Sequence, residues 1–196
     1  PQGDYPSGAL LDSALAAVQT AAREAGLWVV VGSSTQSEGR YYNMVYAIDN
    51  RGEIRSSYGK VHGTGGRDYG RWLEIKAFED EGMRYGLQIC YDARFPEAWR
   101  ILALQGAQVV FHVSHAAGGD AWKTPVWEAH LRSRAAENNY WVVSCNCAGP
   151  VQAGKSYIVD PNGLLVAESN QEREEMITGT VDLSQAKRGI LWSRRT

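Results

Sequence analysis

One cysteine of this chain stands where a nucleophile would be displayed. Residues 86–97 read GLQICYDARFPE, so a short apolar run closes on Cys90 and a polar stretch stopped by proline follows. An apolar run of this length, bounded by a glycine and a turn, is typical of a buried strand. We therefore expect Cys90 at the end of a strand, where its thiolate could attack a carbonyl or nitrile carbon and form a thioester or thioimidate. A buried core thiol is the alternative interpretation.

A lysine thirty positions upstream offers a second reactive group. Lys60 lies in the segment YGKVH, again where a strand passes into a loop. An amine beside a thiol favours the thiolate and can later stabilise an oxyanion. Together the two groups predict acyl-transfer chemistry, whereas a solvated loop lysine is the alternative for Lys60.

The elements that must position these groups alternate along the chain. Apolar periodicity and Gly/Pro punctuation predict helices over 9–25, 96–105 and 124–138, and strands over 27–31, 42–48, 83–90, 108–113, 141–146, 156–159, 163–167 and 176–181. A turn over 49–52 leads into one more strand that ends near residue 58. Alternation in the middle, with hairpins near both ends, indicates an α/β chain with a mixed sheet, as two facing sheets with helices outside.

In four segments the chain resembles the nitrilase superfamily, the carbon–nitrogen hydrolases that cleave amides, carbamoyl groups and nitriles. The segments occur in family order: 42–53, the surroundings of Lys60, the surroundings of Cys90, and 127–138 followed by 154–163. The resemblance covers nearly the whole chain from about residue 10 onward. It implies a single domain over 1–196 with the αββα sandwich fold and two facing mixed sheets, and neither a metal nor a cofactor.

The resemblance also assigns roles to individual residues. Cys90 matches the family nucleophile, and the backbone N–H of Tyr91 would donate to the oxyanion. Lys60 matches the family lysine that holds the same oxygen. His115 and Trp122, in the loop after the strand over 108–113, lie where the family builds its substrate pocket, although His115 would otherwise be a polar surface residue.

The carboxylates are the incomplete part of this match. The family's general base is a glutamate at the end of an early strand, and the opening strand–helix–strand that delivers it is absent here. We therefore expect an amino-terminally incomplete domain, in which no residue is assigned as the base by motif. A second, supporting carboxylate could be Asp68, which sits closer to the expected spacing but is a methylene shorter, or Glu74, or neither.

Composition excludes several other classes of function. A net charge of −2 argues against nucleic acid or an anionic membrane as the main partner. No apolar stretch approaches the roughly 20 residues that span a bilayer. Three cysteines do not suggest a disulfide framework, so a reducing, cytoplasmic setting is expected. The pairs His112 with His115 and Cys145 with Cys147 match no metal-binding motif.

Two functions follow from these observations. The first is thiol-dependent hydrolysis of a small linear amide to a carboxylate and ammonia. Nitrilases proper show Trp-Glu after the cysteine, whereas this chain has Tyr91 and an aspartate there. In this respect it resembles the omega-amidase-like branches, which act on carboxylated amides. The alternative is a catalytically impaired member kept for binding or assembly. The family implies a homodimer or larger homo-oligomer through the helices after Cys90 and around 125–138. Trp99, Trp127 and Trp192 could serve that interface or the core.

Overall fold

A computed structural model describes residues 6–63, 69–70, 72–116, 118, 120, 122–150 and 152–186. The chain divides into two compact units, Pro1–Glu74 and Ile75–Thr196. Within the described ranges, no helix is long and apolar enough to cross a membrane.

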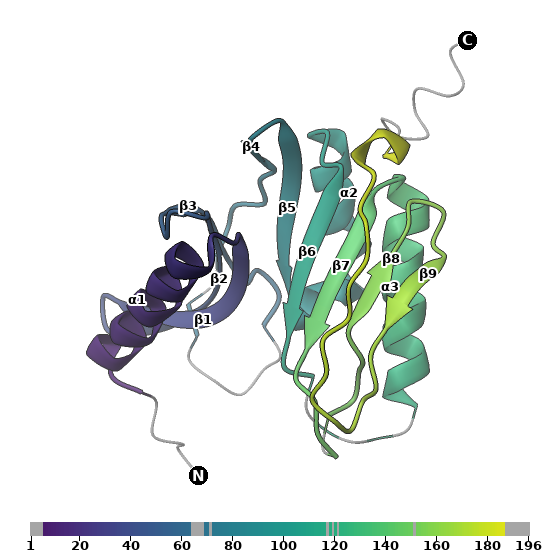
Figure 1. Cartoon of the computed structure of the whole chain (residues 1–196). Helices are drawn as coiled ribbons and strands as arrows, with labels where there is room; N and C mark the ends of the chain where they lie inside the picture. Colours follow the sequence, from purple (N-terminus) through teal and green to yellow (C-terminus); the bar gives the residue numbers. More distant parts are fainter. Residues whose placement is uncertain are drawn as a thin grey trace. The chain divides into compact units, whose positions relative to one another are not determined.

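The first unit is one helix with an antiparallel three-stranded sheet of order β1-β2-β3 (Figure 1). Its elements are α1 (Gly8–Ala25), β1 (Val29–Ser37), β2 (Arg40–Ile48) and β3 (Ile54–Gly59). The helix begins where the Ser7 hydroxyl accepts the N–H of Leu10 at 3.3 Å, and it ends at Gly26, whose φ of 66° suits glycine. The helix predicted over 9–25 is therefore confirmed.

Two tight turns set the register of this sheet. Glu38 and Gly39 join β1 to β2 with φ values of 50° and 74°, the left-handed pair that matches the twist of a hairpin. Between β2 and β3, a carboxylate oxygen of Asp49 accepts the N–H groups of Arg51 and Glu53, each at 2.9 Å. The turn predicted at 49–52 is thus built by side-chain bonding to the backbone.

The strand predicted over 27–31 was wrong in extent, and the burial that its continuous apolar run indicates is only partial. β1 begins at Val29, continues to Ser37, and is only half-buried, while Leu27 is 61% exposed. In the described sheet β1 is an end strand with one partner, β2, so a continuous apolar run did not imply burial on both faces. The first sheet is also antiparallel throughout its described strands rather than mixed.

The second unit is built on a mixed six-stranded sheet of order β4-β5-β6-β7-β8-β9. Its elements are β4 (Phe78–Asp80), β5 (Met83–Ile89), η1 (Cys90–Arg94), α2 (Pro96–Leu104), β6 (Val109–Ser114), α3 (Lys123–Asn138), β7 (Trp141–Asn146), β8 (Tyr157–Val159), β9 (Leu165–Glu168) and η2 (Leu183–Gln185). The strands β5, β6 and β7 are parallel and the remaining pairs antiparallel. Helices α2 and α3 cover one face of this sheet (Figure 1).

The core of the second unit lies between this sheet and its two helices. Trp99 and Leu102 of α2 and Leu131 of α3 are fully buried in it. Trp127 is 9% exposed and belongs to the same cluster, so these two tryptophans are core residues, and Trp192 lies outside the described residues. Gly86 of β5 lets α2 approach closely, since a Cβ there would lie 2.5 Å from Leu102 Cδ1.

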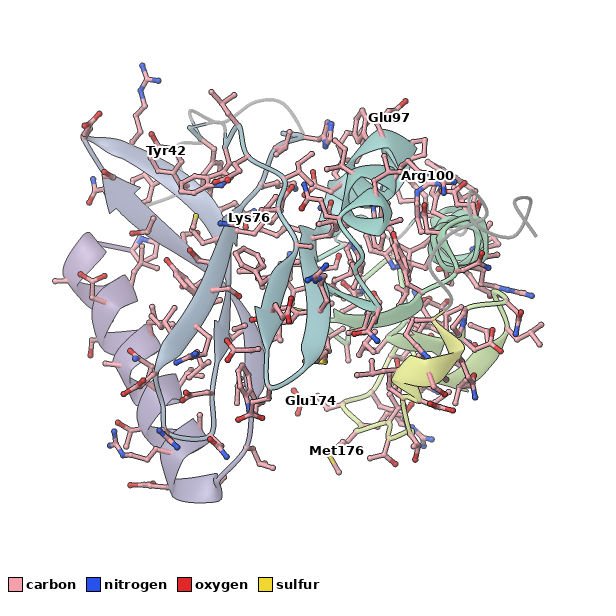
Figure 2. All side chains as sticks on the ribbon, turned by 90° about the horizontal axis from the view of Figure 1, so that it is seen from above. Tyr42, Lys76, Glu97, Arg100, Glu174 and Met176 are labelled. Atoms are coloured by element: carbon pink, nitrogen blue, oxygen red, sulfur yellow. The ribbon has the colours of Figure 1, made fainter. Side chains whose placement is uncertain are left out.

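The last predicted strand, 176–181, does not form. This segment crosses the sheet face opposite α2 and α3, and Met176 extends from it into solvent (Figure 2). Two side chains hydrogen-bond the backbone that follows this segment. Trp141 Nε1 donates to the carbonyl of Asp182 at 2.9 Å, and Gln108 Nε2 donates to the carbonyl of Leu183 at 3.4 Å. A segment that crosses a face has no neighbouring strand with which to form a ladder.

Candidate active site

Cys90 lies at the carboxyl end of β5, as predicted, and opens the short 3-10 turn η1. Its backbone adopts a φ of 47°, the left-handed region that non-glycine residues seldom enter. The residue is partly buried, with its thiol free of any disulfide. A strained cysteine at the end of a parallel strand is the geometry that displays a nucleophile above a sheet.

Neighbouring side chains hold this turn in place. The Asp92 carboxylate accepts the N–H of Ile89 at 3.2 Å, and the Asp92 carbonyl accepts the indole N–H of Trp99 at 2.9 Å. The buried Arg134 of α3 donates from Nε to the carbonyl of Ala93 at 3.1 Å. A left-handed residue costs about 1–2 kcal/mol, and each such hydrogen bond contributes about 0.5–1.5 kcal/mol. The bonds from α2 and α3 therefore offset the strain.

His112, in the middle of β6, contacts the backbone of Cys90. Its Nε2 lies 3.0 Å from the carbonyl oxygen of Cys90 and its Nδ1 lies 2.9 Å from Ser144 Oγ. Because a carbonyl only accepts, Nε2 carries the hydrogen, and in the neutral ring Nδ1 accepts from the Ser144 hydroxyl. The imidazole is buried between the rings of Trp99 and Trp127, at centroid distances of 5.7 and 5.3 Å. From the sequence, His112 was assessed only as a possible metal ligand. A histidine inside an apolar strand could have indicated a buried, hydrogen-bonded role.

His112 belongs to a buried polar row that crosses the sheet under the helices. Gln88, His112, Ser144 and Tyr157 are register partners on successive strands, so their side chains share one face. Neither amide atom of Gln88 nor the hydroxyl of Tyr157 has a hydrogen-bond partner within the described residues. Burial, followed by the charge of Glu128, raises the pKa of Tyr157 and keeps its phenol neutral.

Arg94 contacts two aromatic residues beside this turn. Its guanidinium lies over the rings of Tyr91 and Trp122, at 5.4 and 5.7 Å from their centroids. Two of the predicted substrate-binding residues therefore lie together, and Trp122 is 53% exposed. Burial, then the charges of Arg134 and Arg94, lowers the pKa of His130 on α3.

His115 is exposed and engaged with another loop. Its Nε2 accepts from the side-chain amide of Gln152 at 3.2 Å. The loops after β6 and β7 are tied next to it, since Asn146 accepts the N–H of Ala116 at 2.9 Å and donates to the carbonyl of Gly154 at 2.6 Å. His115 is thus placed at the carboxyl end of the parallel strands, the edge of the sheet that also carries Cys90.

Lys60 lies in the first unit, directly after β3, and is partly buried. Its N–H donates to the carbonyl of Asn43 at 2.9 Å, and its own carbonyl accepts from Trp72 at 3.4 Å. Gly59 precedes it because a Cβ there would lie 2.6 Å from the Trp72 ring. The predicted strand-to-loop position of Lys60 is confirmed.

Of the two candidate carboxylates, the structure describes only Glu74. Asp68 lies outside the described residues, and Glu74 is exposed at the end of the first unit. The structure therefore gathers Cys90, Tyr91 and Trp122 in the second unit, while Lys60 belongs to the first.

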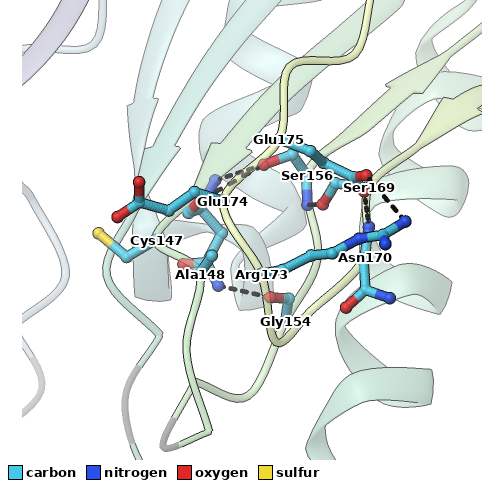
Figure 3. A pocket seen from close by; sticks show the side chains of 10 residues that line it. Cys147, Ala148, Gly154, Ser156, Ser169, Asn170, Arg173, Glu174 and Glu175 are labelled. Carbon is cyan, nitrogen blue, oxygen red and sulfur yellow. Dashed lines mark hydrogen bonds and ion pairs between the residues drawn. The ribbon is translucent and has the colours of Figure 1, made fainter.

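A polar pocket of about 140 Å³ lies past the end of β7 (Figure 3). Its lining comprises Asn146, Cys147, Ala148, Gly154, Ser156, Ser169, Asn170, Arg173, Glu174 and Glu175. Arg173 and Glu175 form an ion pair of 3.6 Å there. Of the predicted site residues that the structure describes, none lines this pocket. In the same parts of the chain, no group of three His, Cys, Asp or Glu side chains could hold a metal.

Comparison with known proteins matches this architecture to amidases. The model of the carbon–nitrogen hydrolase family matches residues 4–189. The 2-oxoglutaramate amidase of Bacillus subtilis is 32% identical over 186 residues, which are 89% of this chain and 69% of that protein. The N-carbamoylputrescine amidase of Arabidopsis thaliana is 27% identical over 88% of this chain and 66% of that protein.

Solved structures of the amidase from Nesterenkonia sp. AN1 have the same mixed α/β fold. A glutamate-to-glutamine mutant, with the acetamide moiety of fluoroacetamide added covalently at the active-site cysteine, superposes with a TM-score of 0.78 at 27% identity. The match covers 85% of this chain and 65% of that one, so this chain spans less than two thirds of the amidase structure. A cysteine-to-alanine mutant in complex with butyramide superposes with a TM-score of 0.76 at 26% identity. The chain therefore belongs to the carbon–nitrogen hydrolase family of the nitrilase superfamily.

Proposed function

We propose that this protein hydrolyses small linear amides through a covalent Cys90 acyl-enzyme. The observation that carries the proposal is the left-handed turn of Cys90 at the carboxyl end of β5, held by α2, α3 and β6. Membership of a family with cysteine amidases supports the same chemistry.

The reaction proceeds in two steps. Cys90 Sγ bonds to the amide carbon, the C–N bond breaks, and the nitrogen leaves as ammonia with the proton that the thiol gave up. Water then attacks the thioester, the C–S bond breaks, and the carboxylate departs while Cys90 regains its proton. The N–H of Tyr91 and the ammonium of Lys60 stabilise the oxyanion in both steps, with Asp68 or Glu74 as the candidate supporting carboxylate. The chemistry needs no cofactor.

The proposed substrate class rests on two cationic side chains beside Trp122, of which Lys123 is also ion-paired with Asp120 at 3.1 Å. Arg94 and Lys123 both lie close to the Trp122 ring, and the pKa of His130 is lowered in part by the charge of Arg94. We propose that the amide carries a carboxylate at its far end and that Trp122 and His115 line its path. The likeness to a 2-oxoglutaramate amidase is in keeping with this class.

The finer architecture is part of the same proposal. We infer that the two sheets face each other as an αββα sandwich within one catalytic domain over 1–196. We also infer a homo-oligomer, as a dimer or a larger assembly.

Ammonia release and intact mass together test this function. Glutaramate should release ammonia faster than butyramide, which lacks the far carboxylate, and the mass should show an acyl adduct on Cys90 during turnover. The variant Cys90→Ala should lose both signals, while Cys145→Ala, which removes an exposed thiol, should keep them. Lys60→Gln should slow ammonia release by about 10²–10³-fold if its ammonium holds the oxyanion. Ammonia release by Cys90→Ala at the wild-type rate would overturn the proposal.

A further inference from the structure

We propose that His112 is a positioning residue that aims the backbone N–H of Tyr91 at the oxyanion. This inference rests on the proposed function, because Tyr91 donates to the oxyanion only there. His112 does not touch the reacting atoms; it acts through the peptide group between Cys90 and Tyr91.

The geometry of that peptide group carries the inference. The carbonyl of Cys90 and the N–H of Tyr91 are the two ends of one planar unit, and in a trans peptide they point in opposite directions. His112 Nε2 lies 3.0 Å from that carbonyl oxygen. Fixing the oxygen therefore fixes the direction of the N–H on the other side.

The other braces of the turn act on neighbouring peptide groups. Trp99 bonds the carbonyl of Asp92, and Arg134 bonds that of Ala93. His112 bonds the carbonyl of Cys90, the residue with φ 47° at which the chain leaves β5 and enters η1. His112 is thus placed to act on the donor itself.

Polarisation adds to orientation. The Ser144 hydroxyl donates to His112 Nδ1 and the imidazole donates to the carbonyl, so two bonds in series precede the N–H of Tyr91. Bonds in such a chain strengthen one another by roughly 10–30% each. Ser144 and His112 are 2% and 1% exposed, so water competes little for these bonds. A donor that is preorganised in a dry site is the main source of oxyanion stabilisation.

The test separates oxyanion chemistry from thiol reactivity. Butyraldehyde adds to the thiol: the S–C bond forms, the carbonyl π electrons move to oxygen, and that oxygen occupies the oxyanion position and takes up the thiol proton. Iodoacetamide instead forms an S–C bond as C–I breaks, and no oxyanion arises. Butyraldehyde affinity therefore depends on the N–H of Tyr91, whereas the alkylation rate depends on access to Cys90.

Four variants give the comparison. His112→Phe keeps a ring between the two tryptophans but has no donor, whereas His112→Gln can still donate from Nε2. Ser144→Ala removes the first bond of the series. Val110→Ala, on the same strand and face as His112 and fully buried, is the matched control for lost packing alone.

We expect His112→Phe to weaken butyraldehyde binding about 10–100-fold, less than the full removal of an oxyanion donor at about 10²–10³-fold. His112→Gln and Val110→Ala should stay within about threefold of wild type, and Ser144→Ala should fall between. The alkylation rate should change less than about threefold in all variants. Unchanged affinity in His112→Phe, or an equal loss in His112→Gln and His112→Phe, overturns the inference. A wild type that binds butyraldehyde at Cys90 but releases no ammonia from amides overturns the proposed function instead, and the comparison of variants still decides the role of His112.

Discussion

The substitution Gly86→Ala tests how closely α2 must approach the sheet to hold the Cys90 turn. The new Cβ would lie 2.5 Å from Leu102 Cδ1 and 3.1 Å from its Cγ. Ordinary carbon contacts are about 3.5–4.0 Å, so α2 or its leucine must move by roughly 1 Å. Leu102 is fully buried and cannot swing into solvent.

The expected cost follows from two opposing terms. Overpacking a core costs about 1–3 kcal/mol, and the short contact places Gly86→Ala near the upper end. Replacing glycine in a strand recovers about 0.5–1 kcal/mol of backbone entropy. We therefore expect the free energy of unfolding to fall by about 2 kcal/mol. Urea unfolding followed by tryptophan fluorescence measures it, with an unchanged m-value if the unfolded state is unaffected.

A double-mutant cycle identifies the contact responsible. Leu102→Ala alone should cost about 2–5 kcal/mol. In the Gly86→Ala background its cost should be smaller by about 1–2 kcal/mol, because the clashing methyl groups are gone. Gly63→Ala is the matched control, since its Cβ would meet nothing, and it should stay within about 0.5 kcal/mol of wild type. Additive costs in the cycle, or a more stable Gly86→Ala, would refute the close approach of α2.

Three further predictions concern indole hydrogen bonds and two perturbed pKa values of the second unit. Trp99→Phe and Trp141→Phe each lose an indole bond of 2.9 Å to a carbonyl, and each should cost about 0.5–1.5 kcal/mol in urea unfolding. Only Trp99→Phe should also change the iodoacetamide alkylation rate of the nucleophile, and equal rates in the two variants would contradict its role. The pKa of His130 lies below its ordinary value of 6.5, so the unfolded chain binds more protons and stability falls as pH drops through that value. Arg94→Gln should raise this pKa in an NMR titration, and an unchanged value would refute the electrostatic cause. Burial raises the pKa of Cys147 above 9.0, so mass spectrometry should find its alkylation half-maximal above that pH.

Glycine, proline and turn residues at the ends of apolar runs allowed much of the second unit to be predicted from sequence. The strand before Cys90 and the helix from Pro96 were found because an apolar run, a turn and a proline follow one another within a few residues. The strands predicted over 156–159 and 163–167 also pair as a hairpin, and Asp160 Oδ1 accepts the N–H groups of Asn162 and Leu164 in the turn between them. Each of these features depends on neighbours in sequence.

Contacts between distant elements were outside the reach of the same patterns. The segment over 176–181 has the composition of a strand, but a strand needs a partner at a sheet edge and this segment crosses a face. The bond between His112 and Cys90 depends on the parallel register of β5 and β6, which apolar periodicity does not specify. The burial of Gln88 could likewise not be predicted, because it depends on the strand register that turns its side chain toward the helices.

The placement of the reactive groups divides the chemistry between two parts of the chain. The strain at Cys90 is held by Trp99, Arg134 and His112, all from the second unit. Thiol alkylation, which needs only an accessible and well-placed sulfur, should therefore depend on the second unit alone. In the proposed function, acylation also needs the oxyanion to be stabilised by Lys60, a residue of the first unit. If Lys60 has the proposed role, Lys60→Gln should slow amide turnover while leaving the alkylation rate of Cys90 intact, and a parallel loss of both rates would contradict that role.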